Sequence, residues 1–363
     1  MAHCAILLVL LIALFKPSAA AAQPTVELRG PQTCSCDIHA ELVVTLSDPD
    51  GKAGLSAPLS VVRLRNGSFL VVPLVQQSAI LHFSESGSFL RRIGRSGRGP
   101  GEFTAVLRFA SLEGDTTAVL DPANRRITLL DPALRPARSI QLPFLAGRFI
   151  WLHSASIILL GSPPGIRDRL HVLDVAGSIV RSFAVDPAVR SSDQTMGPAR
   201  IASTANGQIA LSYRDTYTIE LWDTAGRRTK TIVRNPEWLA PSSRRDAASP
   251  DDPPRPNLGD PTFHADNLLW TVSYVADPEW RSATIMRPDA YGRLQRGVRE
   301  GSADSYWDSI VEILDVDGER LVASQRIDAH LRFIDTRGHA ASYRQDEHGN
   351  PFIDIWKLSM RLR

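Results

Sequence analysis

The sequence predicts an all-β protein: a six-bladed β-propeller of four-stranded antiparallel blades, closed by strands from the N- and C-terminal ends of the chain. Three observations lead to this prediction. A pattern of strand and turn recurs six times, a second hairpin signal precedes it at a nearly constant distance, and a lone strand stands at each end of the repeat region. Single all-β architectures also reach the length of this chain, 363 residues.

The first 22 residues read as a signal peptide. An apolar run of 11 residues from Ala5 to Phe15 is too short to span a bilayer. Ala20 and Ala22 satisfy the rule of small residues before a cleavage site at Gln23. No later stretch reaches the roughly 18 apolar residues of a membrane-spanning helix. We therefore expect export to the periplasm or the medium, no integral membrane segment in the mature chain, an N-terminal segment over 23–40 and one propeller domain over 41–363.

The charge balance excludes a general affinity for nucleic acid or anionic membranes, because 41 basic residues stand against 39 acidic ones. Almost all basic residues are Arg, which suits anion recognition. Because they are scattered, we interpret them instead as codon usage. The mature chain keeps Cys34 and Cys36, for which we expect a local disulfide or two inert thiols, since no His or Cys stands at zinc-finger spacing.

Six segments share one pattern of alternating apolar residues, then usually Asp, two variable residues and usually Gly. Alternation that ends in Asp-x-x-Gly indicates a strand entering a tight hairpin turn, in which Asp accepts amide hydrogen bonds and Gly supplies a positive φ. The steps between successive Asp positions are 47, 43, 49, 92 and 20 residues, against about 40–50 residues for propeller blades. The step of 92 contains insertions, and the step of 20 marks a final blade of different layout. The segments are 80–87, 127–134, 170–177, 219–226, 311–318 and 331–338.

A second turn signal completes each blade. Asn66-Gly67 and Asn206-Gly207 predict type I′ hairpins, and they precede the closing Gly of their repeats by about the same distance. Two turns in one register describe a four-stranded meander, and Asp266-Asn267 is a third candidate. One meander cannot bury both of its faces, whereas stacking around an axis covers them. We expect the lone strands at 41–46 and 352–358 to share a blade and close the ring.

These residues also resemble a known family. The segment 121–131, with Asp, Asn, Arg and Ile before an apolar strand, resembles the NHL-repeat signature. The segments 93–103 and 346–356 are similar to the linker and closing segment of bacterial exported six-bladed propellers of the TolB-like superfamily. The resemblance covers about residues 35–360 and implies a fold more than a function. Related propellers include lactonases with a divalent metal in the axial channel. We expect no cofactor here, and Ca²⁺ only under that alternative, because four ligands cannot be assigned.

The glycine-rich linker at 93–103 has two interpretations. Its backbone amides with Arg95 and Arg98 could cradle an anion. Alternatively, it is a tight crossover between blades with Phe103 packed in the seam. We favour the crossover.

Candidate site residues are few. His264, at the mouth of an inserted region, is a weak candidate acid or base, and no nucleophile elbow of the G-x-S-x-G kind is present. Insertions at about 235–261 and 277–304 carry aromatic and Arg side chains that the repeat does not require, and such residues are enriched at binding hot spots. The predicted binding residues are Trp238, Trp280, Arg281, Arg287 and Tyr291.

These features favour a monomeric binding or scaffold propeller that uses its loops to hold a protein or carbohydrate partner. The alternative is a metal-dependent hydrolase or lyase, lactonase-like, with its site in the axial channel. A third interpretation is a sensory or envelope-assembly module that acts through another protein.

Overall fold

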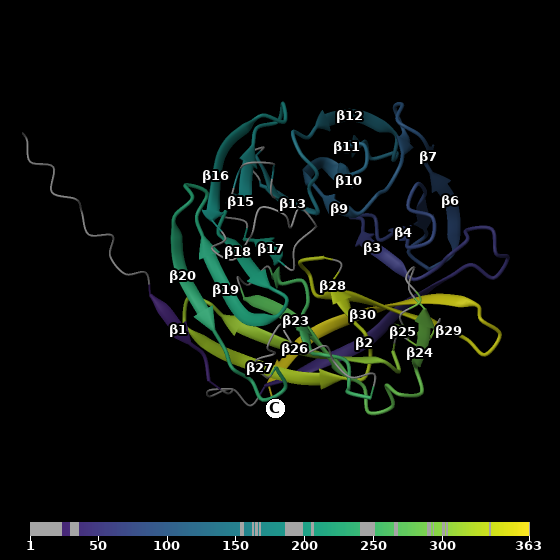
Figure 1. Ribbon diagram of the computed structural model, residues 1–363. Helices are drawn as coiled ribbons and strands as arrows, with labels where there is room; N and C mark the ends of the chain where they lie inside the picture. The colour runs from purple at the N-terminus through teal and green to yellow at the C-terminus, as the bar shows by residue number, and fades with distance from the viewer. Residues whose placement is uncertain are drawn as a thin grey trace, which may run out of the picture.

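The computed structural model describes residues 24–29, 36–152, 156–161, 163, 166, 168–185, 199–204, 207–239, 251–264, 268–288, 292, 294–299, 302, 304–333 and 335–362. The expected signal peptide, Cys34, the Asp266-Asn267 turn and Tyr291 lie outside these ranges. Within them, six sheets stand around one axis as the blades of a propeller (Figure 1). The prediction of an all-β, six-bladed propeller is therefore confirmed. No helix in the described part of the chain is long and apolar enough to cross a membrane.

Blades 1 to 3 are regular four-stranded meanders. Blade 1 consists of β3 (Pro58–Arg63), β4 (Phe69–Pro73), β5 (Ile80–Phe83) and β6 (Phe89–Ile93). Blade 2 consists of β9 (Arg108–Ser111), β10 (Thr117–Asp121), β11 (Arg126–Leu130) and β12 (Pro136–Gln141). Blade 3 consists of β13 (Arg148–Trp151), β14 (Ile157–Leu160), β15 (Asp168–Leu173) and β16 (Ile179–Val185).

Blades 4 to 6 carry additions. Blade 4 consists of β17 (Ala199–Ser203), β18 (Ile209–Tyr213), β19 (Thr216–Trp222) and β20 (Arg228–Val233), with β1 (Thr25–Glu27) outside β20. Blade 5 consists of β21 (Asn257–Leu258), β22 (Thr262–Phe263), β23 (Leu269–Ala276), β26 (Trp307–Asp315) and β27 (Arg320–Ile327), and the hairpin of β24 (Thr284–Pro288) and β25 (Leu294–Val298) is inserted between β23 and β26. Blade 6 consists of β28 (Arg332–Phe333), β29 (His339–Gln345), β30 (Pro351–Leu362) and β2 (Cys36–Ser47). The linker strands are β7 (Arg95–Ser96) and β8 (Glu102–Phe103), and the 3₁₀ turn η1 is Glu113–Asp115.

Burial follows the position of a strand within its blade. The second strands β4 and β14 are buried along their whole length, and their unbroken apolar sequences are typical of strands covered on both faces. The outer strand β12 exposes all but one of its residues. The first strands of neighbouring blades contact one another and surround the centre of the ring in Figure 1, where β3, β9, β13, β17 and β28 are labelled.

The two ends of the chain close the ring in blade 6. Antiparallel pairing runs from Cys36 opposite Leu362 to Ser47 opposite Phe352, so the prediction of a shared blade is confirmed. The pairing is longer than the two predicted strands. The sequence did not indicate β1, which adds in parallel to the outer edge of blade 4. Cys36, at the start of β2, forms a disulfide.

The Asp-x-x-Gly turns behave as predicted in four cases and differ in one. Gly87, Gly177, Gly226 and Gly338 have φ values between 78° and 91°. At Gly318 the prediction is wrong, because Glu319 takes the left-handed position with φ 53°. This turn is one residue longer than the others. Asp315 pairs with Arg320, five residues later, whereas in blade 4 the amide of Asp223 donates to the carbonyl of Arg227, four residues later. The segment 331–338 also lies between the first and second strands of its blade, unlike the other copies.

Outer strands carry a basic residue that holds the next blade. In each case the side chain donates to a main-chain carbonyl in the turn that leads into the outer strand of the following blade. The pairs are Arg91 with Ala133, Arg138 with Val175, Arg181 with Thr224 and Lys230 with Val316. Three arginines and a lysine therefore occupy one repeated position, a regularity that our interpretation as codon usage missed.

The glycine-rich linker is a crossover. Phe103 is fully buried, and a Cβ on Gly94 would lie 2.4 Å from its ring. Arg126 donates to the carbonyls of Arg98, Gly99 and Glu102. The signature residues of blade 2 thus tie the linker to the blade, which supports the interpretation that we favoured over the anion cradle.

Candidate functional site

Four arginines occupy the same place in four blades, at the start of the innermost strand. Arg108 and Arg148 begin β9 and β13, Arg332 begins β28, and Arg200 is the second residue of β17. An apolar residue follows each of them. The apolar residues pack in the cores between blades, and because successive side chains on a strand point to opposite sides, the arginines point away from those cores.

Asp260, two residues before β22, supplies the acidic partner from blade 5. Its carboxylate lies 2.9 Å from the guanidinium of Arg148, 2.9 Å from that of Arg200 and 3.3 Å from that of Arg108. Burial acts to raise the pKa of Asp260, but the charges of the surrounding arginines outweigh it and lower that pKa to about 2. Asp260 is therefore ionised at neutral pH. We call Arg108, Arg148, Arg200, Arg332 and Asp260 the axial cluster.

The axial cluster has more positive charge than Asp260 can neutralise. Four guanidiniums against one carboxylate leave a formal charge of 4 − 1 = +3. Burial lowers the pKa of Arg148 to about 9; Asp260 opposes this shift, and the positive charges of Arg108 and Arg200 add to it. Arg148 is still protonated at neutral pH, but its charge is held among like charges.

The cluster also has unused hydrogen-bond donors. Each guanidinium carries five N–H donors, and a carboxylate accepts at about four positions. The buried Nε atoms of Arg108 and Arg148 have no hydrogen-bond partner in the described part of the chain. Water reaches the cluster, since between 15% and 36% of the side-chain surface of Arg108, Arg148, Arg200 and Asp260 is exposed. The arrangement thus combines unused guanidinium donors with partial exposure to water, and guanidinium groups have the chemistry to bind anions.

The axial cluster does not fit the divalent metal that the resemblance to lactonases implies. Ca²⁺ takes six to eight oxygen ligands. Among the described residues of the cluster, Asp260 alone offers a carboxylate, and its oxygens already face three arginines. The positive surplus would repel a cation at this place.

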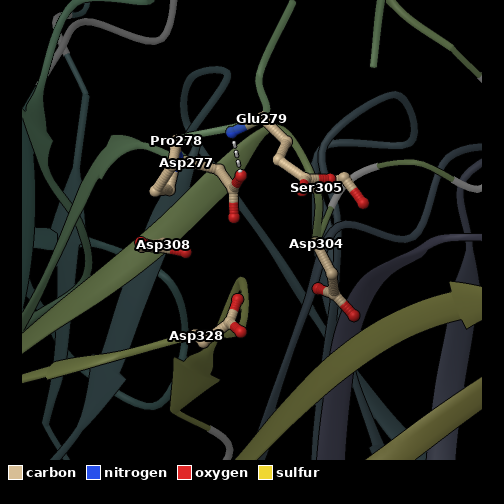
Figure 2. A pocket seen from close by; sticks show the side chains of 7 residues that line it. All are labelled: Asp277, Pro278, Glu279, Asp304, Ser305, Asp308 and Asp328. Atoms are coloured by element: carbon tan, nitrogen blue, oxygen red, sulfur yellow. Dashed lines mark hydrogen bonds between the residues drawn. The ribbon is translucent and has the colours of Figure 1, made fainter. Parts of the chain in front are cut away.

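An acidic pocket lies in blade 5, where the inserted hairpin leaves and rejoins the blade (Figure 2). It encloses about 490 Å³. Oxygen atoms of Asp277, Asp308 and Asp328 lie within 4.8 Å of one another, and Asp304 faces the same space. Its lining residues are Asp277, Pro278, Glu279, Asp304, Ser305, Asp308 and Asp328.

Protein donors already hold the buried carboxylates of this pocket. Arg326 donates to Asp308 at 2.6 Å, the amide of Glu279 donates to Asp277 at 2.6 Å, and the amide of His330 donates to Asp304 at 3.1 Å. Burial raises the pKa of Asp304 to about 6. Burial also raises the pKa of Asp308 to about 6, although Arg326 opposes the shift. Two carboxyl groups of the pocket, those of Asp304 and Asp308, thus have raised pKa values.

The predicted binding tryptophans have packing roles. Trp280 is 5% exposed and packs with Ala283 and Tyr306 in a small core of the insertion, with the guanidinium of Arg281 4.6 Å from its ring centre. Trp238 is half-buried, 6.0 Å from the ring of Tyr217. Burial of this kind accounts for both indoles without a partner.

The predicted binding arginines lie on the surface of the insertions. Arg281 is exposed and donates to the carbonyl of Asp251 at 3.2 Å, so the two insertions do meet. Arg287 is exposed on β24. Tyr291 is outside the described residues. Whether this surface binds a partner stays a prediction.

His264 follows β22, whereas Asp260 of the axial cluster precedes it. Its ring stacks on Trp270 with centres 4.1 Å apart and an angle of 7°, and it meets the edge of Phe333 of blade 6. The position is one of packing between blades, and a role in acid–base chemistry stays a prediction.

Sequence reasoning missed the axial cluster, although a signal was present. The dipeptides Arg108-Phe109, Arg148-Phe149, Arg200-Ile201 and Arg332-Phe333 all open innermost strands. Alignment of the blades on their first strands would have shown this repeat. Asp260 carries no such signal, because it lies between β21 and β22 of blade 5, within the range that we had predicted as an insertion.

The fold defines the class of this protein as a six-bladed β-propeller, and comparisons with known proteins agree. A family model described as a 6-bladed beta-propeller matches residues 55–154. No curated protein matches the sequence significantly.

Solved structures of Bacteroides proteins share the fold at low sequence identity. A predicted exported protein of Bacteroides fragilis is 12% identical, with a TM-score of 0.56 over 93% of this chain and 99% of that one. A member of the DUF4221 family from Bacteroides vulgatus is 10% identical, with a TM-score of 0.60 over 90% of this chain and 99% of that one. A protein of unknown function from Bacteroides thetaiotaomicron is 7% identical, with a TM-score of 0.50 over 89% of this chain and 76% of that one. These similarities concern the fold.

Proposed function

We propose that this protein is an exported, non-catalytic binding propeller that takes up a small anionic ligand at the axial cluster. The observation that carries the proposal is the convergence of Arg108, Arg148 and Arg200 on the single carboxylate of Asp260, with buried donors left over. Hydrogen bonds to charged groups contribute about 1.5–3 kcal/mol each. Strands fix the arginines before the ligand arrives, so little ordering is needed on binding.

Calorimetric titration of the mature protein with phosphate, citrate and acetate tests the proposal. Arg148→Met removes a guanidinium but keeps an unbranched side chain, and it should weaken binding by about tenfold or more. Arg138→Met, in the outer strand β12, is the matched control and should bind as the wild type does. The proposal is wrong if no anion binds, or if Arg148→Met binds as well as Arg138→Met.

A second candidate function is the capture of a protein or carbohydrate partner by the insertions. The contact between Arg281 and Asp251 supports it, because it joins two long loops into one surface. Replacement of Arg287, exposed and away from the core of the insertion, should weaken capture of such a partner without changing the melting temperature. The metal-dependent hydrolase or lyase has less support, because the described residues of the axial cluster are mostly cationic.

A further inference from the structure

The axial cluster has a second feature that bears on the kind of anion it selects. Arg332 donates to the carbonyl of Pro58 at 3.2 Å, and it forms no ion pair in the described part of the chain. Its charge nevertheless reaches Asp260, whose pKa it helps to lower. The other three arginines share that carboxylate, so Arg332 is the member of the cluster whose charge is least neutralised.

We propose, on the basis of the anion binding proposed above, that the ligand is a compact oxyanion with at least two negative charges, whose oxygens are bound by Arg332 on one side and by Arg108 and Arg148 on the other. A polycarboxylate and a phosphate monoester share this chemistry.

The charge of the cluster supports this class of ligand. A monoanion would leave a formal charge of +3 − 1 = +2 among like charges that are half-buried at Arg108, Arg148 and Arg200 and exposed at Arg332, whereas a dianion or trianion leaves +1 or none. Interactions between charges are stronger away from bulk water. The negative charge of the ligand should therefore contribute most at the half-buried guanidiniums.

The positions of the arginines support a ligand that is contacted from two sides. Blades 2 and 3 supply Arg108 and Arg148 next to Asp260, and blade 6 supplies Arg332 beside blade 1. The unpartnered Nε donors belong to Arg108 and Arg148, on the other arc of the ring from Arg332. A planar guanidinium binds carboxylate or phosphate through paired hydrogen bonds, so a ligand with oxygens on two sides satisfies both arcs.

The test is a series of titrations at fixed ionic strength with acetate, succinate, citrate and inorganic phosphate. In the wild type, succinate, citrate and phosphate should bind about tenfold or more tightly than acetate. Arg332→Met should weaken the binding of succinate, citrate and phosphate about tenfold more than it weakens the binding of acetate, and so remove most of this difference. A comparison of the affinities for succinate and citrate with the affinity for phosphate shows whether the site prefers carboxylate or phosphate ligands.

The outcomes separate this inference from the proposed function. If no anion binds, the axial binding function itself is wrong. If acetate binds as tightly as the other anions, or if Arg332→Met keeps the full preference, the protein binds anions but the inference is wrong. Arg332→Lys, which keeps the charge without the planar fork, should retain part of the preference, and a melting curve of each variant confirms folding.

Discussion

The outer and innermost strands of this propeller both carry arginines at repeated positions, but their partners differ. On the outer strands, Arg91, Arg138 and Arg181 are exposed, and each donates to a main-chain carbonyl of the next blade. On the innermost strands, Arg108, Arg148 and Arg200 are partly buried and share one carboxylate.

This difference in partners separates the arginines that stabilise the fold from those that do not. An exposed side chain that bonds a carbonyl joins two blades and needs no ligand. A group of guanidiniums around the axis is unfavourable for the fold by itself, because like charges repel and burial removes water. On our proposal, the axial arginines serve ligand binding, whereas the outer ones hold neighbouring blades together.

The largest effect should come from the closing strand, because strand pairing and packing hold the ring. Removal of residues 351–363 deletes β30, which pairs with both β2 and β29 and buries Ile353, Ile355 and Leu358. At about 1.5–3 kcal/mol for each buried side chain, the free energy of unfolding should fall by several kcal/mol. Chemical denaturation measures it. A truncated protein that unfolds at the same denaturant concentration would show that the ring closes in another way.

Asp260→Asn should have the next largest effect, since it leaves the axial arginines without their counter-charge. We expect a loss of about 1–3 kcal/mol at low salt, partly restored by acetate or phosphate. Because the folded-state pKa is lowered to about 2, the wild-type carboxylate stabilises the fold above about pH 4, and this contribution is lost as the pH falls toward 2. Thermal melts with and without anion measure it, and stabilisation by Asp260→Asn would contradict the account.

The acidic pocket should give a smaller effect of opposite sign. The pKa of Asp304 is raised to about 6, so the folded protein holds a proton there more tightly than the unfolded chain does. Stability should therefore fall as the pH rises from about 4 to above 6. Asp304→Asn should remove this loss and stabilise the protein at pH 7.5 by about 1–2 kcal/mol, with little effect at pH 4. Equal effects at the two pH values would show that the carboxyl group titrates normally.

Loss of an outer arginine should have the smallest effect. Arg138→Met removes one exposed hydrogen bond, to the carbonyl of Val175, and should change the free energy of unfolding by less than about 1 kcal/mol. Chemical denaturation without citrate measures the free energy of unfolding, and the added stability in citrate measures the anion affinity. If this variant lost as much anion affinity as Arg148→Met, the two positions would not differ in function.

Much of the fold follows from local signals in the sequence. The Asp-x-x-Gly turns can be predicted from a few residues, because a hairpin needs an amide acceptor and a residue with positive φ within a few positions. The pairing of β2 with β30 follows from the need to close the ring. The place of β1 does not follow, since a short edge strand carries no periodic pattern.

The axial cluster could not be predicted from local signals of this kind. Arg108, Arg148 and Arg200 lie in different blades, and their guanidiniums meet at Asp260 only once the ring has formed. The aromatic residues of the insertions drew attention instead, yet Trp280 packs within its own loop. An insertion that folds needs a core of its own, so its aromatic content does not by itself indicate a partner.

The most direct test of the axial site is a crystal structure of the protein with selenate, a compact dianion whose selenium scatters anomalously. The account predicts an anomalous peak on the axis, within hydrogen-bond distance of Arg332 and of Arg108 or Arg148, that disappears in Arg148→Met. A structure in which selenate occupies surface sites while the axial cluster remains without it would contradict the account.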